Sequence, residues 1–349
     1  MKNYKLKNPK YAFLEKSNNE VNEPAIKYNN AAKRCLYCYA TLPKEDEYYH
    51  KSCSKRFFGQ DYVPQFEYDR PALDELARQF VNANMAVTGV QAKISLSWHK
   101  KSERNTVKKL SIVGLYGDYI LKPQADYYRS LPELEDCTMK MARVCGLQTV
   151  PHTLFPLKDG TLSYLTKRID RTRTGMRHME DFCQLTERLT EDKYKGSHEQ
   201  VAKALMRFSD APMLDVGNFY EYVIFSFLTG NADMHLKNFS ILETAVDGKY
   251  LLSPAYDLLN TAIVNKADTE ELALTLNGKK SKLKYNDFLV AYTLAGLSKK
   301  QLDKTLENFY YCHLEMLDLL NNSFLAEDLK AEYHDLLMSR LDRLTSNLA

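Results

Sequence analysis

Residues 230–241 read GNADMHLKNFSI, and a second acid, Asp257, follows directly after Tyr256. Asp233 and Asn238 stand five positions apart, which is the spacing of a phosphoryl-transfer loop in which the Asp orients the attacking hydroxyl and the Asn binds a metal ion. Magnesium prefers hard oxygen ligands and keeps several waters, so one amide oxygen, one carboxylate and the nucleotide phosphates suffice to hold it. Taken alone, the same spacing also fits a solvated surface turn. The stretch predicts Asp233 as the base, with Asn238 and Asp257 as magnesium ligands.

The upstream sequence supplies a structural context for this loop. A glycine turn comes first, formed by Thr88, Gly89, Val90 and Gln91, and it leads into an alternating apolar and polar run over residues 94–98. Such alternation predicts a half-buried strand. A glycine before a strand lets the backbone approach a phosphate group closely.

Two further segments extend the pattern. Residues 119–121 (YIL) predict a short buried strand that ends in Lys122, a cation suited to nucleotide phosphates. Helical spacing over residues 133–145 places Glu135 where it can pair with Lys122, as a strand lysine and a helix glutamate do in protein kinases. Each residue alone is usually solvated, but the order of glycine turn, lysine strand, acidic helix and Asp–Asn loop favours a nucleotide site.

Together these segments resemble the HipA-like serine/threonine kinases, the toxins of bacterial type II toxin–antitoxin modules. The resemblance covers about residues 70 to 349 and rests on seven motifs in order: Thr88 to Gln91, Tyr119 to Lys122, Leu131 to Glu133, Lys167 to Arg171, Glu180 to Gln184, Gly230 to Ser240, and Ala255 to Asp257. It implies an α+β, two-lobed protein-kinase-like fold with a mixed strand and helix N-lobe and a mainly helical C-lobe.

The resemblance also implies the site residues and the cofactors, ATP and Mg²⁺. The catalytic set would be Asp233, His235 and Lys237, and magnesium would lie on Asn238 and Asp257. The nucleotide would contact Thr88, Gly89, Val90, Gln91, Lys122 and Glu135, together with a hinge against adenine formed by Lys167, Arg168 and Ile169.

Partners follow from the same resemblance. Relatives phosphorylate aminoacyl-tRNA synthetases and so arrest growth, which makes a protein substrate of that class the expectation. The cognate antitoxin would be a DNA-binding helix-turn-helix protein, or a small protein supplying the N-terminal subdomain that longer relatives carry ahead of the kinase core.

Two positions depart from the family pattern. Ala86 stands where relatives often carry a regulatory serine, leaving Thr88 as the nearest hydroxyl for self-phosphorylation. Lys167 replaces an acidic hinge residue of some relatives, so only backbone contacts to adenine carry over at this position.

The N-terminal region contains a separate cluster of metal-ligating residue types. Cys35 and Cys38 form C-x2-C, and after eleven residues His50 and Cys53 form H-x2-C. Such pairs suit tetrahedral Zn²⁺, and a closed set of four ligands is structural rather than catalytic. The alternative is a small loop with buried thiols and a hydrogen-bonded histidine. The remaining cysteines stand singly in apolar helical patterns and are expected in the core: Cys137, Cys145, Cys183 and Cys312.

Composition agrees with a large folded enzyme. The chain has 349 residues, of which 44% are hydrophobic and 27% charged, and its length favours two lobes over one. Its net charge of +3 is nearly neutral and gives no reason to expect direct nucleic-acid binding. No apolar run approaches the about twenty residues that a bilayer crossing needs, and no signal peptide is recognised, so a cytoplasmic protein without membrane contact is expected.

The expected organisation is a flexible arm over residues 1–30, a Cys/His module over 31–70, a kinase N-lobe over 71–171 and a helical C-lobe over 172–349. Two other functions remain open from the sequence. One is a small-molecule kinase of the aminoglycoside or choline type, which shares the same loop. The other is a catalytically inactive kinase fold that serves as a binding module.

Overall fold

The computed structural model describes residues 34–44, 47–82, 91–98, 109–113, 117–172 and 175–346, without the side chains of 77–82. Thr88, Gly89, Val90, Ala86 and the arm over residues 1–30 therefore lie outside the described residues. The chain divides into two compact units. Unit 1 holds the described residues up to Pro132 together with Thr153–Thr166, and unit 2 holds Glu133–His152 and the residues from Lys167 onward.

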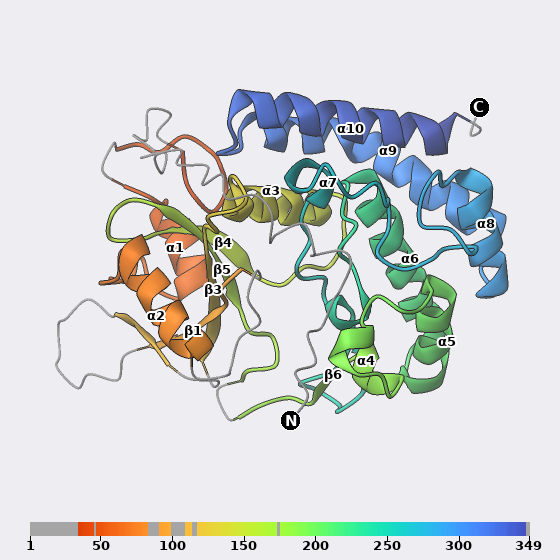
Figure 1. Ribbon diagram of the computed structural model, residues 1–349, viewed down its shortest axis with the longest axis horizontal. Coiled ribbons are helices and arrows are strands. Elements are labelled where there is room, and N and C mark those ends of the chain that lie inside the picture. Colours follow the sequence, from red (N-terminus) through yellow and green to blue (C-terminus); the bar gives the residue numbers. More distant parts are fainter. Residues whose placement is uncertain are drawn as a thin grey trace. The chain divides into compact units, whose positions relative to one another are not determined.

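A five-stranded sheet forms the centre of unit 1 (Figure 1). Its strand order is β2-β1-β3-β5-β4, and β1 pairs antiparallel with both β2 and β3. The elements that build this unit are helices α1 (Lys51–Phe58) and α2 (Arg70–Asn82) and strands β1 (Ile94–Trp98), β2 (Leu110–Ile112), β3 (Tyr119–Pro123), β4 (His152–Pro156) and β5 (Leu162–Lys167).

Aromatic side chains join the Cys/His segment to this sheet. Phe57 of α1 lies with its ring centroid 6.0 Å from that of Tyr119 on β3, and Phe58 lies 6.0 Å from Phe155 on β4. The hydroxyl of Tyr49 donates a hydrogen bond to the backbone carbonyl of Leu154. Buried aromatic rings dominate core energetics, so the segment shares the core of unit 1.

Unit 2 is mainly helical (Figure 1). Its elements begin with most of α3 (Leu131–Val144) and continue with β6 (Met179–Asp181), α4 (Phe182–Leu185), the 3₁₀ turn η2 (Thr190–Asp192), α5 (His198–Phe208), α6 (Pro212–Leu228), the 3₁₀ turn η3 (Leu236–Asn238), β7 (Ser240–Glu243), β8 (Tyr250–Leu252), α7 (Thr261–Val264), α8 (Tyr285–Leu294), α9 (Lys299–Asn321) and α10 (Glu327–Thr345).

Helix α6 lies in the core of unit 2 because apolar residues cover nearly its whole circumference. Its Phe219 packs against Phe239, with ring centroids 4.9 Å apart, and its Phe227 packs against Phe288 of α8 at 5.5 Å. A helix with apolar side chains on all its faces is stable only when neighbouring elements cover it on all sides. Among the described helices, none combines the length and the apolar character that a membrane crossing requires.

A small antiparallel sheet, β6-β7-β8, flanks the loop that follows α6. Its central strand, β7, begins directly after that loop, and Ser240 on β7 pairs with Asp181 on β6. The strands predicted over 94–98 and 119–122 and the helix predicted over 133–145 are present, with boundaries shifted by one or two residues at most.

Candidate functional site

The loop after α6 is held in place at its first residues by the segment that begins α7. Gly230 has φ +76°, and a Cβ there would lie 2.7 Å from Oδ1 of Asn260, so this position excludes a side chain. The hydroxyl of Thr261 accepts a hydrogen bond from the amide of Ala232 at 2.8 Å and donates one to the carbonyl of Gly230 at 3.1 Å. The start of the loop is therefore fixed by contacts about thirty residues away in sequence.

Asp233 and Asn238 are linked directly within the loop. The side-chain amide of Asn238 donates to the backbone carbonyl of Asp233 at 3.0 Å. The backbone amide of Asp233 in turn donates to Oδ1 of Asn231 at 3.1 Å. Asn238 is buried in η3, whereas Asp233 is half-buried. The structure thus brings together the two residues whose spacing suggested a phosphoryl-transfer loop.

Tyr194 is a residue of this site that sequence reasoning missed. Its hydroxyl donates a hydrogen bond to Oδ1 of Asp233. The loop that carries it is tied to the loop after α6 by a hydrogen bond from the amide of Leu236 to the carbonyl of Lys193, 3.1 Å long. Sequence periodicity could not identify Tyr194, because periodicity reports neighbours a few residues apart and the contact with Asp233 spans 39 positions.

His235 lies buried beside the two acids. Burial lowers the pKa of its imidazole to about 4, and the positive charge of Lys193 acts in the same direction, whereas the nearby carboxylates of Asp233 and Asp257 oppose the shift. The imidazole is therefore neutral at physiological pH. Its edge-on contact with the ring of Tyr194, centroids 5.0 Å apart, makes it a packing element of the site.

The end of the loop is tied to neighbouring strands. Lys237 forms an ion pair with Asp181, Nζ to Oδ2 2.6 Å, and Asp181 also caps the start of α4. The hydroxyl of Tyr256 donates to the carbonyl of Lys237 at 3.1 Å and lies 2.5 Å from the hydroxyl of Ser240. Tyr256 thereby holds the next residue, Asp257, beside the loop after α6. Asp257 adopts φ +55°, a left-handed conformation that non-glycine residues rarely take.

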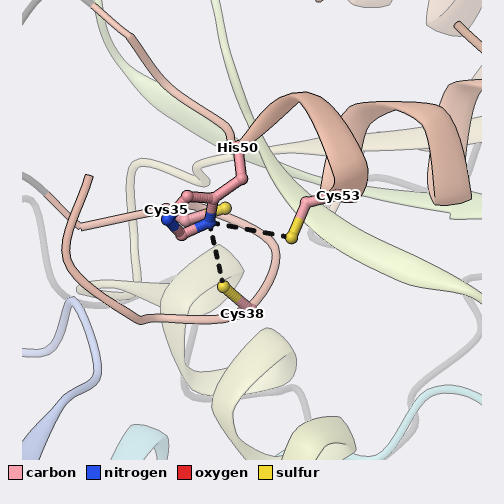
Figure 2. Close-up of side chains that lie close together, drawn as sticks. All are labelled: Cys35, Cys38, His50 and Cys53. Atoms are coloured by element: carbon pink, nitrogen blue, oxygen red, sulfur yellow. Dashed lines mark hydrogen bonds between the residues drawn. The ribbon is translucent and has the colours of Figure 1, made fainter. Parts of the chain in front are cut away.

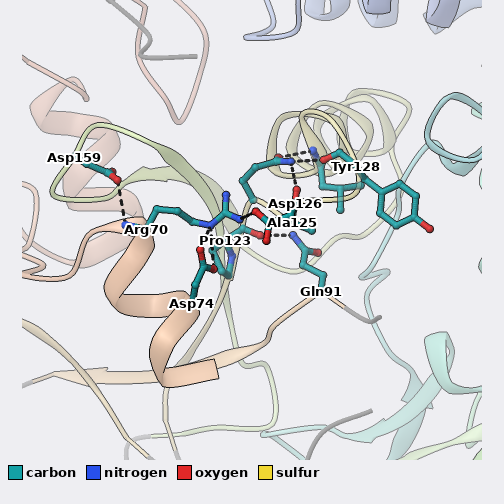
Figure 3. Close-up of polar contacts among 10 residues, drawn as sticks. Arg70, Asp74, Gln91, Pro123, Ala125, Asp126, Tyr128 and Asp159 are labelled. Atoms are coloured by element: carbon teal, nitrogen blue, oxygen red, sulfur yellow. Dashed lines mark hydrogen bonds and ion pairs between the residues drawn. The ribbon is translucent and has the colours of Figure 1, made fainter. Parts of the chain in front are cut away.

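In unit 1, Lys122 is buried on β3 with only 3% of its surface exposed. Its Nζ lies 5.3 Å from the ring centroid of Tyr164, a cation–π distance. The side chain of Gln91 donates to the carbonyl of Pro123, the residue after Lys122, at 2.8 Å (Figure 3). The last residue of the predicted glycine turn is therefore attached to the strand that carries the lysine.

Helix α2 begins beside the same strand end. Arg70 binds Asp74 one turn further along, Nε to Oδ2 2.8 Å, and also pairs with Asp126 (Figure 3). Its backbone amide donates to Asp159 at 3.1 Å. These contacts fix the start of α2 to the segment after β3. Arg70 therefore stabilises unit 1, because its guanidinium binds two acids of that unit.

Glu135 is buried on α3, with 3% of its surface exposed. It belongs to unit 2, whereas Lys122 belongs to unit 1, so the pairing of these two residues stays a prediction. The next residue, Asp136, is also buried and binds Lys140 at 2.5 Å and Nδ1 of His152 at 2.8 Å. The acid-rich start of α3 therefore includes one acid that is satisfied inside unit 2.

The predicted hinge begins at the end of β5. The amide of Lys167 donates to the carbonyl of Pro151 at 2.9 Å, and burial lowers the pKa of the Lys167 ammonium. Arg168 forms a two-pronged ion pair with Asp170, with N–O distances of 3.1 and 2.8 Å. The carbonyl of Ile169 accepts a hydrogen bond from Arg177. The backbone of this segment is thus ordered by its own neighbours.

Four ligating side chains of the Cys/His segment converge in unit 1 (Figure 2). One ligand atom from each of Cys35, Cys38, His50 and Cys53 lies within 4.8 Å of every other. Nδ1 of His50 lies 3.4 Å from Sγ of Cys38 and 3.8 Å from Sγ of Cys53. Zn–S bonds of about 2.3 Å and Zn–N bonds of about 2.0 Å in a tetrahedron put neighbouring ligand atoms about 3.5 to 3.8 Å apart. The cluster therefore fits a tetrahedral metal ion.

The orientation of His50 supports the same conclusion. Its Nε2 lies 2.9 Å from the carbonyl of Thr41, an acceptor that requires the proton to sit on Nε2. Nδ1 then presents its lone pair to the three sulfur atoms. Metal-binding histidines usually donate a hydrogen bond from the N–H of the second ring nitrogen to a carbonyl or carboxylate in this way.

Comparisons with known proteins identify the family of the chain. The family profile of the HipA-like C-terminal domain matches residues 85–315. Y4dM of Sinorhizobium fredii, which is named as a kinase only provisionally, is 31% identical over 249 residues, covering 66% of this chain. Y4mE of the same organism, named in the same way, is 33% identical over 162 residues, covering 44% of this chain. The chain spans only 59% and 38% of the lengths of these two relatives.

A solved structure extends the likeness to the fold. A chain of the Shewanella oneidensis MR-1 toxin–antitoxin complex of HipA, HipB and operator DNA matches with a TM-score of 0.63 and 21% identity, covering 78% of this chain and 71% of that one. At this identity the match shows the fold alone. It confirms the predicted α+β kinase-like architecture.

Proposed function

Because the chain belongs to the family of the HipA-like C-terminal domain, we propose that it is an ATP-dependent serine/threonine protein kinase. The observation that carries this proposal is the loop after α6, in which one hydrogen bond joins Asp233 to Asn238 and Tyr256 holds Asp257 alongside. Phosphoryl transfer needs little covalent help from the protein and depends on positioning and electrostatics. A rigid loop that presents a carboxylate, an amide oxygen and a second carboxylate meets that need.

The side chains of the loop and Asp257 have separate roles in this proposal. The carboxylate of Asp233 orients the substrate hydroxyl and accepts its proton as the phosphoryl group arrives. Asn238 and Asp257 would hold Mg²⁺, which neutralises charge on the nucleotide phosphates when bound. Lys237 stabilises the loop through Asp181, and His235 supports it as a neutral buried ring.

Groups from both units are assigned to the nucleotide in this proposal. Lys122 supplies a positive charge to the phosphates, and Thr88 to Gln91 would contribute backbone amides. Glu135 is assigned to orient Lys122, and the backbone of Lys167 to Ile169 to contact adenine. Support for Lys122 comes from its place near the end of β3, next to Pro123, whose carbonyl accepts a hydrogen bond from Gln91 of the predicted glycine turn.

For substrate and partners, the proposal follows the family. The chemistry of Asp233 acts on a serine or threonine hydroxyl of a protein, and aminoacyl-tRNA synthetases are the class to test first, with growth arrest as the consequence. A HipB-like antitoxin is proposed as partner because the solved neighbour is a complex of HipA, HipB and operator DNA. A small protein supplying an N-terminal subdomain is the other partner to test.

We also propose that Cys35, Cys38, His50 and Cys53 hold one structural Zn²⁺. The support is the set of ligand distances and the orientation of His50 through Thr41. Three thiolates and one imidazole close the tetrahedron and leave no position for a substrate, so this ion would stabilise unit 1 and take no part in catalysis.

The kinase proposal is tested with labelled ATP and a bacterial cell lysate. Wild-type protein should transfer label to a specific lysate protein on serine or threonine, and Asp233→Asn should do so at least about a hundredfold more slowly. Identification of the labelled protein by mass spectrometry then reports the substrate. Labelling that is absent, or equal for the two proteins, would overturn the proposal.

A further inference from the structure

Tyr194 makes a contact that the roles assigned above do not use. It lies in the loop between α4 and α5, and its hydroxyl donates to Oδ1 of Asp233. Its ring lies edge-on to His235, with centroids 5.0 Å apart and an interplanar angle of 84°. The residue before it, Lys193, accepts a backbone hydrogen bond from Leu236. Tyr194 is therefore attached to the catalytic loop by its hydroxyl, its ring and its neighbouring backbone.

The rest of the Tyr194 loop is also held firmly. Arg188 donates to the carbonyl of Lys195 at 2.6 Å and to Oε1 of Gln200 at 2.9 Å. Lys195 pairs with Asp192 at 2.6 Å. These contacts, with the hydrogen bond from the amide of Leu236 to the carbonyl of Lys193, order the backbone on both sides of Tyr194. This arrangement suits a fixed support better than a gate.

Asp233 needs such a support. Hydrogen bonds to Asn231 and Asn238 fix its backbone, but the torsion that turns a carboxylate about its Cβ–Cγ bond is broad and weakly restrained. A tyrosine hydroxyl on Oδ1 restrains that torsion. From the part of the chain that the structure describes, no hydrogen bond reaches Oδ2. The second oxygen is thus the one presented to a substrate hydroxyl.

We propose that Tyr194 is a positioning residue for phosphoryl transfer: its hydroxyl holds Oδ1 of Asp233 so that Oδ2 receives the hydroxyl of the substrate. This inference rests on the proposed kinase function. The proton of the substrate hydroxyl passes to Oδ2 as its oxygen forms a bond to the γ-phosphorus of ATP and the bond to the leaving ADP breaks. Tyr194 keeps its own proton throughout.

Tyr194→Phe removes only the hydroxyl and tests the role. The matched control is Tyr285→Phe. Tyr285, the first residue of α8, also donates to an acid, Asp303 of α9, at 2.5 Å, and that acid has no role in the proposed site. Labelled ATP with bacterial lysate is the probe, and the rate of label transfer is measured against ATP concentration. Misplacing a catalytic group by about 1 Å can cost a hundredfold, so Tyr194→Phe should lower the rate at saturating ATP about ten- to a hundredfold.

Two further readouts separate positioning from general damage. The half-saturating ATP concentration and the thermal midpoint of Tyr194→Phe should match those of the wild type. In addition, Tyr194→Phe should have no effect in an Asp233→Asn background, because the hydroxyl acts through Asp233 and the two changes cannot then add. Tyr285→Phe should leave the transfer rate unchanged.

The outcomes distinguish this inference from the proposal on which it rests. If the wild type labels a protein, Asp233→Asn labels it far more slowly, and Tyr194→Phe is as fast as the wild type, the positioning role is overturned alone. A faster Tyr194→Phe would show that the tyrosine blocks the base, and a lowered thermal midpoint would assign a structural role; either overturns the inference. Labelling that is absent or insensitive to Asp233→Asn overturns the kinase function and the positioning role together.

Discussion

The side-chain amide nitrogen of Asn238 donates a hydrogen bond to the backbone carbonyl of Asp233 over 3.0 Å. Nitrogen and oxygen occupy opposite ends of an amide, so this bond also directs Oδ1 of Asn238 away from the Asp233 backbone. One contact therefore sets the position of the proposed base and the direction of the proposed metal ligand.

Asp233→Asn and Asp257→Asn should separate two functions of the site. Asp233→Asn removes the carboxylate that accepts the proton, so phosphoryl transfer should fall about a hundredfold or more while magnesium-dependent ATP binding persists. Asp257→Asn removes a charged magnesium ligand, so binding should weaken as well. Calorimetric titration of ATP with and without Mg²⁺, beside the labelling assay, provides both numbers. Near-normal transfer by Asp233→Asn would rule out its role as the base.

Lys122→Ala should raise the half-saturating ATP concentration about ten- to a hundredfold, because a hydrogen bond to a charged group contributes about 1.5–3 kcal/mol. Lys158→Ala is the control, since Lys158 is an exposed lysine of the same unit. The measurement is the ATP dependence of the labelling rate. Equal shifts in the two variants would show that Lys122 contributes only general charge.

The local parts of this architecture could be predicted from the sequence. The strand that carries Lys122, the helix over 133–145 and the paired ligands of the Cys/His cluster depend on neighbours a few residues apart, and periodicity or spacing reveals them. Tyr194 and Asp181 contact the loop after α6 from 39 and 56 positions away in the sequence. Only the tertiary fold brings those side chains to it, so no window of sequence could show these contacts.

Removal of zinc should affect more than the Cys/His segment. Structural zinc contributes on the order of 10 kcal/mol in small modules. Because Tyr49 bonds to Leu154 and Phe58 packs on Phe155, a chelator should increase hydrogen exchange in β4 and β5 as well, while α9 and α10 keep their protection. Elemental analysis of protein purified without a metal-affinity tag should find one zinc per chain.

Cysteine variants provide the control for this prediction. Cys38→Ser should lose the zinc, whereas Cys183→Ala, a buried cysteine of unit 2, should retain it. Substoichiometric zinc in the wild type, or full zinc in Cys38→Ser, would contradict the four-ligand site.

His198 should make unit 2 sensitive to acid. It is fully buried between Phe219 and Phe239, and among the described residues neither ring nitrogen has a hydrogen-bond partner. Burial, with the charge of Lys280, lowers the pKa of His198 to about 3, against about 6.5 in the unfolded chain. As pH falls below 6.5 the unfolded chain binds a proton that the folded chain does not, so the free energy of unfolding decreases.

The size of this effect is measurable by chemical denaturation. Between pH 7.5 and 5.0 the group removes about 2 kcal/mol from the free energy of unfolding. His198→Phe should therefore lose less stability over this range than the wild type does. His334→Phe, at an exposed histidine, should follow the wild type. Equal losses in all three proteins would exclude His198 as the source.

At residue 257, the residue types that best stabilise the left-handed backbone should differ from those that support phosphoryl transfer. A φ of +55° costs an ordinary residue about 1–2 kcal/mol. Glycine adopts this conformation without that cost, and asparagine and aspartate adopt it more readily than bulkier or β-branched residues do. A saturation mutagenesis library scored for both protein abundance and phosphoryl transfer should therefore rank substitutions at residue 257 in two different orders. Glycine and asparagine should be abundant but inactive, and β-branched residues should be depleted by both scores. Selection for phosphoryl transfer would therefore keep aspartate at residue 257, although glycine would lower the conformational strain of the backbone there.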